Sequence, residues 1–337
     1  MRKPSRLALL VLLAGTMLWA AKNLEIYFID VEGGQATLIV TPARQSLLVD
    51  AGWPGYNGRD AGRIAETAKR AGLRQIDYLL MTHYHLDHVG GIPPLVEHLP
   101  AVTFVDHGPN TETGKSADAL SAAYAKVVEK GKHLVVKPGD KIPLKGVEAV
   151  VITARGEKIT APLKGAGAAN PHCAGVPPKE EDPTENGRSV GFLLTYGKFR
   201  FLDLADLTWN KELALMCPNN PIGTVDVYLV NHHGMNISNA PPLVYGVRPR
   251  VAILPNGAKK GGAPDAMEWI RKSPGLEDLW QLHYSLPGKD ANVPEQFIAN
   301  PQEQCQGHAI KLVASPDGSF TVTNERNNFT KPYPAKR

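Results

Sequence analysis

The stretch MTHYHLDHVGG, residues 81–91, brings His83, His85, Asp87 and His88 close together along the chain. It follows the short apolar run IDYLL, which is typical of a buried strand, so a rigid element presents these side chains at its end. Imidazole nitrogens suit zinc, and a nearby carboxylate adds negative charge that permits a second ion. The spacing favours one ion at His83 and His85 and another at Asp87 and His88. The stretch therefore predicts a metal centre rather than a hydrated loop.

Short apolar runs and segments of helical periodicity recur on both sides of this stretch. The predicted strands include LEIYFIDV, ATLIVTP, SLLVDAG, VEAVVITA, SVGFLLTYG, KFRFLDLAD and VDVYLVNHHG, and the predicted helices include AGRIAETAKRAG and ADALSAAYAKVVEKG. A closing hairpin is expected around Pro316-Asp317-Gly318. Residues 158–188 are rich in Gly, Pro and charge, which predicts a long loop. The pattern indicates an α/β fold of two sheets packed together with helices outside.

Other candidate ligands lie where predicted strands end. Asp50 follows SLLV, Asp206 ends FLDLAD, and His232-His233 follow the run VYLVN. Any one of these residues is compatible with a simple turn, but several such endings favour a shared site. A carboxylate between two cations reduces their repulsion, and ions about 3.5–4 Å apart hold a water whose pKa falls toward about 7. The residues thus predict a hydroxide held between two metals as a nucleophile.

The histidine motif resembles that of the metallo-β-lactamase superfamily, whose signature is His-x-His-x-Asp-His after a strand. The order of FIDVEGGQATLIVTP, SLLVDAG, THYHLDHVGG, NGRSVGFLLTYGKFRFLDLAD and LVNHHG is similar to the branch that contains the hydrolase domain of competence (DNA-uptake) proteins. The likeness covers about residues 24–315. It implies an αββα sandwich of two mixed sheets, with the site at one edge between them.

The resemblance also implies roles for single residues. Two zinc ions are expected, with manganese as the alternative, and the implied metal ligands are His83, His85, Asp87, His88, Asp206 and His233. Asp206 would bridge the ions, and Asp87 and Asp206 are the implied catalytic carboxylates. His232 is the alternative to His233, or a substrate contact. Asp50 would orient the histidine loop from behind the ligands.

The sequence departs from the family pattern at two places. The third histidine expected for the first metal is missing before GFLLTYG, where Asn186 or Ser189 stands instead. The first metal therefore has an open position, or takes His172 from the long loop as its ligand. The turn after the first strand reads EGGQ rather than Gln-Gly-Asp, which favours a substrate different from that of the competence branch.

Three further groups are weaker candidates for the rim of the site. His107 and His283 each follow an apolar run, although a solvated loop is the expected place for both. Lys259 and Lys260 could face an anion, and a solvated turn is the alternative.

The expected function is hydrolysis of a phosphodiester or a related phosphorylated ester, either small or polymeric. A β-lactam or lactone hydrolase is the alternative, and an inactive binding domain is disfavoured because Asp87 and Asp206 are both present. Nucleic acid gains no support as a partner, since the net charge is only +4 and no basic stripe with interleaved aromatic residues occurs. The oligomeric state is left unassigned.

The first 21 residues resemble a secretory signal, because Arg2, Lys3 and Arg6 precede a short apolar run that ends in small residues. We expect export to the periplasm or the extracellular space, with an N-terminal membrane anchor as the alternative. Residues 22–337 are expected to form a single hydrolase domain without a further membrane span. The 3 cysteines allow at most one internal disulfide, and they match no metal or redox motif.

Overall fold

The computed structural model describes residues 23–336, so the predicted signal segment at residues 1–21 lies outside the described residues. One sheet has nine strands. Its strand order is β18 (Phe329–Tyr333), β17 (Phe320–Asn324), β16 (Ile310–Ala314), β1 (Leu24–Phe28), β2 (Thr37–Val40), β3 (Ser46–Val49), β4 (Ile76–Leu80), β5 (Ala101–Asp106) and β6 (Lys132–Val135). Strands β3 to β6 run parallel, and the other pairs are antiparallel.

The second sheet is also mixed. Its strand order is β15 (Ile298–Asn300), β14 (Asp278–His283), β13 (Val251–Leu254), β12 (Val227–Leu229), β11 (Phe199–Asp203), β10 (Gly191–Tyr196), β8 (Glu148–Ala154) and β7 (Lys141–Ile142), and β9 (Glu157–Lys158) pairs with β8. Strands β11 to β15 are parallel, whereas β7, β8, β9 and β10 pair in the antiparallel sense.

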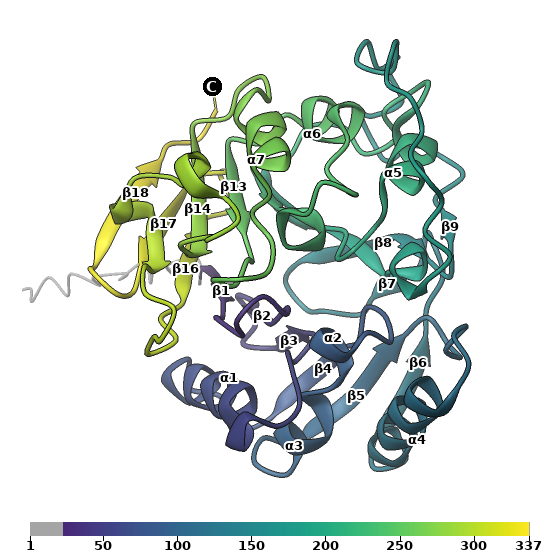
Figure 1. Ribbon diagram of the computed structural model, residues 1–337, viewed down its shortest axis with the longest axis vertical. Coiled ribbons are helices and arrows are strands. Elements are labelled where there is room, and N and C mark those ends of the chain that lie inside the picture. The colour runs from purple at the N-terminus through teal and green to yellow at the C-terminus, as the bar shows by residue number, and fades with distance from the viewer. Residues whose placement is uncertain (1–22, 337) are drawn as a thin grey trace, which may run out of the picture.

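The two sheets pack face to face, and helices cover both outer faces (Figure 1). The core between the sheets joins side chains of both, among them Phe28, Phe201 and Trp280. A second core lies under α1 (Arg59–Arg70), α3 (Ile92–Val96) and α4 (Lys115–Val128), and a third under α5 (Trp209–Met216), α6 (Pro241–Val247) and α7 (Pro264–Arg271). The predicted αββα sandwich is therefore confirmed.

Local sequence explains these elements. Every residue of β2 (TLIV) is buried, as expected for a strand with a packed layer on each face. Helix α1 buries Ala61, Ile64 and Ala68, which share one helical face. The remaining short helices are α2 (Leu86–Val89), η1 (Tyr56–Gly58), η2 (Glu185–Arg188), η3 (Asn231–Gly234), η4 (Lys289–Ala291) and η5 (Glu295–Phe297). Within residues 23–336, no helix is long and apolar enough to cross a membrane.

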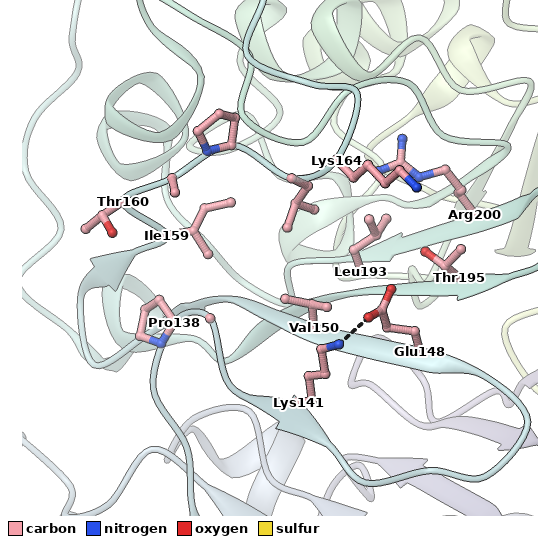
Figure 2. A pocket seen from close by; sticks show the side chains of 14 residues that line it. Pro138, Lys141, Glu148, Val150, Ile159, Thr160, Lys164, Leu193, Thr195 and Arg200 are labelled. Carbon is pink, nitrogen blue, oxygen red and sulfur yellow. Dashed lines mark hydrogen bonds and ion pairs between the residues drawn. The ribbon is translucent and has the colours of Figure 1, made fainter.

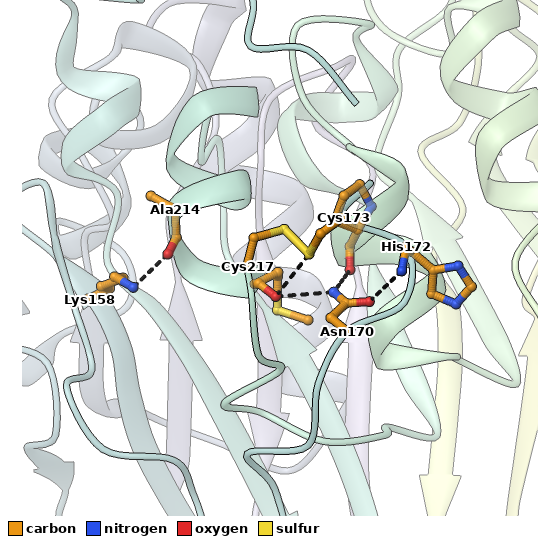
Figure 3. Close-up of a disulfide and its surroundings, with 8 residues drawn as sticks. Lys158, Asn170, His172, Cys173, Ala214 and Cys217 are labelled. Atoms are coloured by element: carbon orange, nitrogen blue, oxygen red, sulfur yellow. Dashed lines mark hydrogen bonds between the residues drawn. A yellow bond between two sulfur atoms is a disulfide. The ribbon is translucent and has the colours of Figure 1, made fainter. Parts of the chain in front are cut away.

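The predicted long loop runs between β9 and η2 and is fastened to the second helical layer. A disulfide joins Cys173 of the loop to Cys217, which follows α5 (Figure 3). Beside it, the Asn170 side-chain amide donates hydrogen bonds to the carbonyl oxygens of Met216 and Pro242, at 3.1 and 2.8 Å. Cys305 remains as the free thiol.

Candidate metal centre

Four strands from the two sheets end at the predicted metal centre. In the first sheet, β3 leads to Asp50 and β4 leads to the histidine motif. In the second sheet, β11 leads to Asp206 and β12 leads to the pair His232-His233. Because β3 and β4 are neighbours and β11 and β12 are neighbours, the two pairs of strands deliver these side chains to one edge of the sandwich.

Asp87, His88, Asp206 and His233 form a compact buried cluster, which we call the histidine–aspartate cluster. One nitrogen or oxygen atom from each residue lies within 4.8 Å of the others. The His88 Nε2 atom is 3.2 Å from Asp206 Oδ2 and 3.3 Å from Asp87 Oδ2. The His233 Nε2 atom is 3.2 Å from Asp87 Oδ2 and 3.4 Å from Asp206 Oδ2. Two imidazoles thus face two carboxylates across a small space.

Several buried polar atoms at this centre lack hydrogen-bond partners, as expected of side chains that bind a metal. The Nε2 atoms of His83, His88 and His233 and the Oδ1 atom of Asp206 are buried and make no hydrogen bond within the described chain. Buried polar groups without partners are costly. The Lys260 ammonium contacts Asp87 Oδ2, so one cation already lies against the cluster. Imidazole and carboxylate ligands of this kind fit a divalent cation.

Hydrogen bonds behind the cluster fix the direction of its imidazoles. The Nδ1 atom of His88 lies 2.7 Å from Asp50 Oδ2, and that of His233 lies 3.0 Å from the Pro255 carbonyl oxygen. Since both partners are acceptors, each Nδ1 donates a hydrogen bond away from the cluster, and each Nε2 is directed into it. Asp50 is fixed in turn by the Thr82 backbone N–H and hydroxyl, at 2.8 and 2.7 Å. Asp50 therefore lies behind His88 and orients its imidazole.

The electrostatics of the centre favour cation binding. Burial raises the pKa of Asp87, but the nearby His88 and His233 outweigh it and hold this pKa well below its usual value. Burial likewise opposes ionisation of Asp206, and the neighbouring histidines again lower its pKa well below the ordinary range. Burial and the nearby His88 hold the pKa of His83 well below its ordinary value, so the His83 imidazole is neutral. Ionised carboxylates and a neutral imidazole are the forms that bind a metal.

His83 and His85 differ in their surroundings. The His83 Nε2 atom lies 3.9 Å from Asp206 Oδ2, at the margin of the cluster. His85 is partly exposed, and its Nε2 atom lies 3.1 Å from Glu112 Oε1. The His83 and His85 ring centroids are nevertheless only 4.7 Å apart. The role of His85 as a ligand of the first metal stays a prediction.

The His232-His233 pair adopts an uncommon backbone. Both residues have φ of 52°, in the left-handed region, and Asp50 has φ of 58°. Such conformations cost free energy in residues other than glycine and tend to occur at functional sites. The His232 Nε2 atom lies 3.5 Å from Asp206 Oδ2, while its Nδ1 atom lies 3.2 Å from the Ser238 hydroxyl. Burial lowers the His232 pKa to about 4. Both imidazoles therefore reach Asp206.

The two candidates for the missing ligand lie in different places. The Asn186 amide nitrogen donates to Asp182 Oδ2 at 2.8 Å, and its Oδ1 atom is buried without a hydrogen bond to any described residue. The Ser189 hydroxyl is also buried and makes no hydrogen bond to any described residue. The His172 ring instead packs against Tyr245 of α6, with a centroid distance of 5.3 Å, next to the disulfide (Figure 3). The structure therefore does not bring His172 to the histidine–aspartate cluster.

The expectation that His107 and His283 are solvated loop histidines is wrong, because both are buried. The His107 Nε2 atom lies 2.9 Å from Glu185 Oε2. The His283 Nε2 atom lies 2.7 Å from Asp30 Oδ1. Each imidazole pairs with a carboxylate from a segment distant in sequence. This pairing offsets the cost of burying the imidazole in the protein interior. No pattern in the sequence indicated Glu185 or Asp30 as these partners.

The EGGQ turn packs directly on the helix that carries Asp87. The Gln35 backbone N–H donates to the Asp87 carbonyl oxygen at 3.1 Å. A Cβ atom at Gly34 would lie 2.4 Å from that same oxygen, so only glycine fits there. Differences in this turn from the competence-protein pattern therefore lie next to a predicted ligand.

One cavity lies beside the cluster and another lies away from it. A cavity of about 500 Å³ is lined by Lys260, which contacts Asp87, and by Arg59, Arg63 and Lys259. A cavity of about 700 Å³ is lined by Val150, Leu193, Thr195 and Arg200 of the second sheet and by the start of the long loop (Figure 2). None of the predicted site residues lines this larger cavity.

Comparison with known families agrees with the fold and the motif. Residues 29–176 match the model of the metallo-beta-lactamase superfamily, and this range contains the histidine motif. This part of the chain is therefore similar to the metallo-beta-lactamase superfamily.

Individual relatives match over short segments. The lactamase-like protein aptB of Emericella nidulans is 38% identical over 74 residues, which is 21% of this chain and 22% of that protein. A hydroxyacylglutathione hydrolase of Xanthomonas campestris pv. campestris is 36% identical over 73 residues, 22% of this chain and 25% of that protein. The chain thus spans about a quarter of the length of these curated relatives. The metallo-beta-lactamase fold protein YhfI from Bacillus subtilis is 12% identical, with a TM-score of 0.47 over 77% of this chain and 95% of that one.

Proposed function

We propose that this protein is a metal-dependent hydrolase whose centre is the histidine–aspartate cluster. The observation that carries the proposal is the convergence of buried His83, His88 and His233 Nε2 atoms and Asp206 Oδ1, which have no hydrogen-bond partner among residues 23–336. A divalent metal here would supply Lewis acidity and a nucleophile derived from water near neutral pH. Zinc suits these ligands, and manganese is the alternative.

Asp206 is the residue that would serve two ions. Its Oδ2 atom lies between 3.2 and 3.9 Å from the Nε2 atoms of His83, His88, His232 and His233. No other carboxylate among the described residues lies within 4 Å of this many imidazole nitrogens. A carboxylate in this position offsets the repulsion between two cations. We therefore propose a dinuclear centre, with the first ion at His83 and His85 and the second at Asp87, His88 and His233.

In this proposal, the side-chain oxygen of Asn186 is a ligand of the first ion. Its amide nitrogen is engaged by Asp182, which leaves the buried Oδ1 atom as the free group. An amide oxygen is a weaker zinc ligand than imidazole, so the first ion would be held more loosely. Asp87 and Asp206, as ionised carboxylates, would hold the centre in place while His85 moves from Glu112 to its ion.

We propose an anionic ester as the substrate, with a phosphodiester or related phosphorylated ester as the leading class. The support is the cavity of about 500 Å³ beside Asp87, which Arg59, Lys259 and Lys260 line. Once Asp87 binds a metal, the Lys260 ammonium is free to face a substrate anion. Leu86 and Ile237, which stand next to the ligand segments, are 42% and 40% exposed, so they offer apolar contact to the ester's organic groups.

Cleavage of a carbonyl ester, such as a β-lactam, lactone or thioester, is the second candidate. It is supported by the similarity to a hydroxyacylglutathione hydrolase over a short segment. The same centre would serve either reaction, because a fold and a metal site do not fix the electrophile. Substrate tests must therefore decide.

The experiment compares bis-p-nitrophenyl phosphate, a chromogenic cephalosporin and a homoserine lactone, with zinc or manganese added to the full chain. We expect hydrolysis of the phosphodiester that is lost in Asp206→Asn and kept in His172→Ala, which is the matched control away from the cluster. Preference for the lactone or the cephalosporin would favour the second candidate. Equal rates in Asp206→Asn and the unmodified protein would overturn the proposed centre.

We further propose that the protein is exported. The basic and apolar character of residues 1–21 is the first support. The Cys173–Cys217 disulfide is the second, because disulfides persist mainly in oxidising compartments. N-terminal sequencing of the mature protein tests this, and a chain still starting at Met1 in the cytoplasm would contradict it.

A further inference from the structure

A second group of metal-binding side chains lies outside the histidine–aspartate cluster. It consists of Asp30, Glu32, His283 and Cys305, and one ligand atom of each lies within 4.8 Å of the others. Asp30 and Glu32 follow β1, His283 ends β14, and Cys305 lies in the loop before β16. The group therefore joins segments from both sheets that are far apart in sequence.

The distances within this group resemble the edges of a zinc tetrahedron. For Zn–N, Zn–O and Zn–S bonds of ordinary length, neighbouring ligand atoms lie about 3.4–3.6 Å apart. The His283 Nε2 atom is 3.4 Å from Glu32 Oε2 and 3.8 Å from Cys305 Sγ. The Cys305 Sγ atom is 3.2 Å from Asp30 Oδ2 and 3.3 Å from Glu32 Oε1. The His283 contacts use Asp30 Oδ1 and Glu32 Oε2, whereas the Cys305 contacts use Asp30 Oδ2 and Glu32 Oε1, so both carboxylates must turn and the 2.7 Å hydrogen bond between His283 Nε2 and Asp30 Oδ1 must lengthen to admit an ion.

Arg63 contacts one oxygen of each carboxylate, and its Nη2 atom also lies 3.4 Å from Cys305 Sγ. Its Nη1 atom donates to Asp30 Oδ2 at 2.7 Å and to Glu32 Oε1 at 3.2 Å. The opposite oxygens, Asp30 Oδ1 and Glu32 Oε2, are the ones nearest His283. Donors behind a ligating carboxylate hold it in position for a metal. Arg63 therefore orients two of the four ligands.

The net charge of this group is negative, which favours binding of a cation. Asp30 and Glu32 carry two negative charges against the single positive charge of Arg63, so a neutral imidazole and thiol leave the group with one negative charge. In this count the Cys305 thiol carries its proton. A divalent ion that displaces this proton would bring the group to neutrality.

We propose that Asp30, Glu32, His283 and Cys305 form a second metal site that binds one zinc ion in a closed, structural set of four protein ligands. Binding forms a bond from Cys305 Sγ to the ion, and the thiol proton passes to solvent. The ion enters through the cavity of about 500 Å³, which Glu32 and Cys305 line. Because Glu32 precedes the turn that packs on Asp87, the zinc would fix that turn beside the histidine–aspartate cluster.

Cobalt provides the test, because Cys305 is the only thiol outside the disulfide in a chain with 3 cysteines. Metal-free full-length protein with its disulfide intact is titrated with Co²⁺ alone. A thiolate-to-cobalt charge-transfer band can then come only from Cys305, since the histidine–aspartate cluster contains no cysteine. We expect the band in the unmodified protein and in Asp206→Asn. It should be absent in Cys305→Ser, together with the loss of one metal equivalent per chain.

Two further measurements make the outcome decisive. His283→Gln should lose most of the band, because the imidazole is a ligand, and zinc should protect Cys305 from alkylation in the unmodified protein. Cobalt binding without a thiolate band in the unmodified protein would overturn the proposal. A band of full intensity in His283→Gln, or equal alkylation rates with and without zinc, would also overturn it and leave only a salt-bridge cluster around Arg63.

Discussion

The Asp50 Oδ2 atom lies 2.7 Å from His88 Nδ1, and this contact determines which nitrogen of His88 faces Asp87 and Asp206. Both residues are fully buried, so water does not compete for the bond. Asp50 holds its own position through Thr82, the residue just before the first histidine of the motif. A carboxylate at the end of one strand thus orients a ligand that follows the neighbouring strand.

Replacing Asp50 by Asn should weaken metal binding without removing any direct ligand. Loss of such an orienting partner typically lowers metal affinity about 10- to 100-fold. Competition with a chromogenic chelator measures the change. Asp106→Asn is the matched control, because Asp106 is also buried at a strand end of the same sheet but contacts Tyr124 and His133. An equal loss of affinity in both variants would mean that general destabilisation is the cause.

The two proposed ions should differ in affinity. With Asn186 in place of a third histidine, the first ion is expected to leave sooner during dialysis against a weak chelator. Asn186→His should tighten this ion, since imidazole is the stronger zinc ligand. His172→Ala should leave the metal content unchanged because its ring packs against Tyr245. Release of one ion per chain by His172→Ala would contradict this assignment.

Glu185 should make the protein sensitive to acid. Burial opposes its ionisation, but hydrogen bonds from His107 and Thr111 outweigh this and lower its pKa from 4.5 to about 2. Since the folded-state pKa lies below the unfolded one, the stabilisation is complete above pH 4.5 and is lost as the pH falls toward 2. The shift corresponds to at most about 3 kcal/mol of unfolding free energy.

Denaturant unfolding between pH 2 and 7 checks this expectation. Glu185→Gln should have a smaller free energy of unfolding at pH 7. Its free energy of unfolding should also fall less steeply in acid, because the variant lacks the carboxyl group with the lowered pKa. Glu181→Gln, at an exposed position four residues earlier, is the control and should follow the unmodified protein. An unchanged acid slope in Glu185→Gln would rule out this role.

The disulfide should stabilise the long loop. Cys173 and Cys217 are 44 residues apart, and a crosslink of this kind typically contributes about 2–4 kcal/mol. The double variant Cys173→Ser/Cys217→Ser should lose stability of that order in thermal or denaturant unfolding. Thiol titration of the denatured, unreduced protein should find one thiol, and reduction should raise this to 3. Three thiols before reduction would show that the bond does not form.

The sequence predicted the parts of the structure that depend on short-range patterns. Apolar runs and turn residues located β1 to β4, β8, β10 to β12 and the hairpin of β16 and β17, and therefore the two-sheet architecture. The strand β5 (AVTFVD) was not predicted. The short edge strands β15 and β18 also went unpredicted.

The parts of the site that depend on contacts between distant segments could not be predicted from the sequence. Strand ends pointed to Asp50, Asp206 and His233, whose places follow from the order of the strands. The burial of His107 and His283 could not be predicted, because their partners Glu185 and Asp30 come from segments 78 and 253 residues away. The same reason kept Cys305 and Arg63 from being linked with Asp30.

The most direct test of the proposed function is the metal content of purified full-length protein, measured beside its hydrolytic rate. Using a Cys305→Ser background removes the proposed structural zinc from the count. Asp206→Asn in this background should lose most of the remaining metal and all detectable hydrolysis while keeping the circular dichroism of the folded protein. Full metal content together with undiminished hydrolysis in that folded variant would contradict the account.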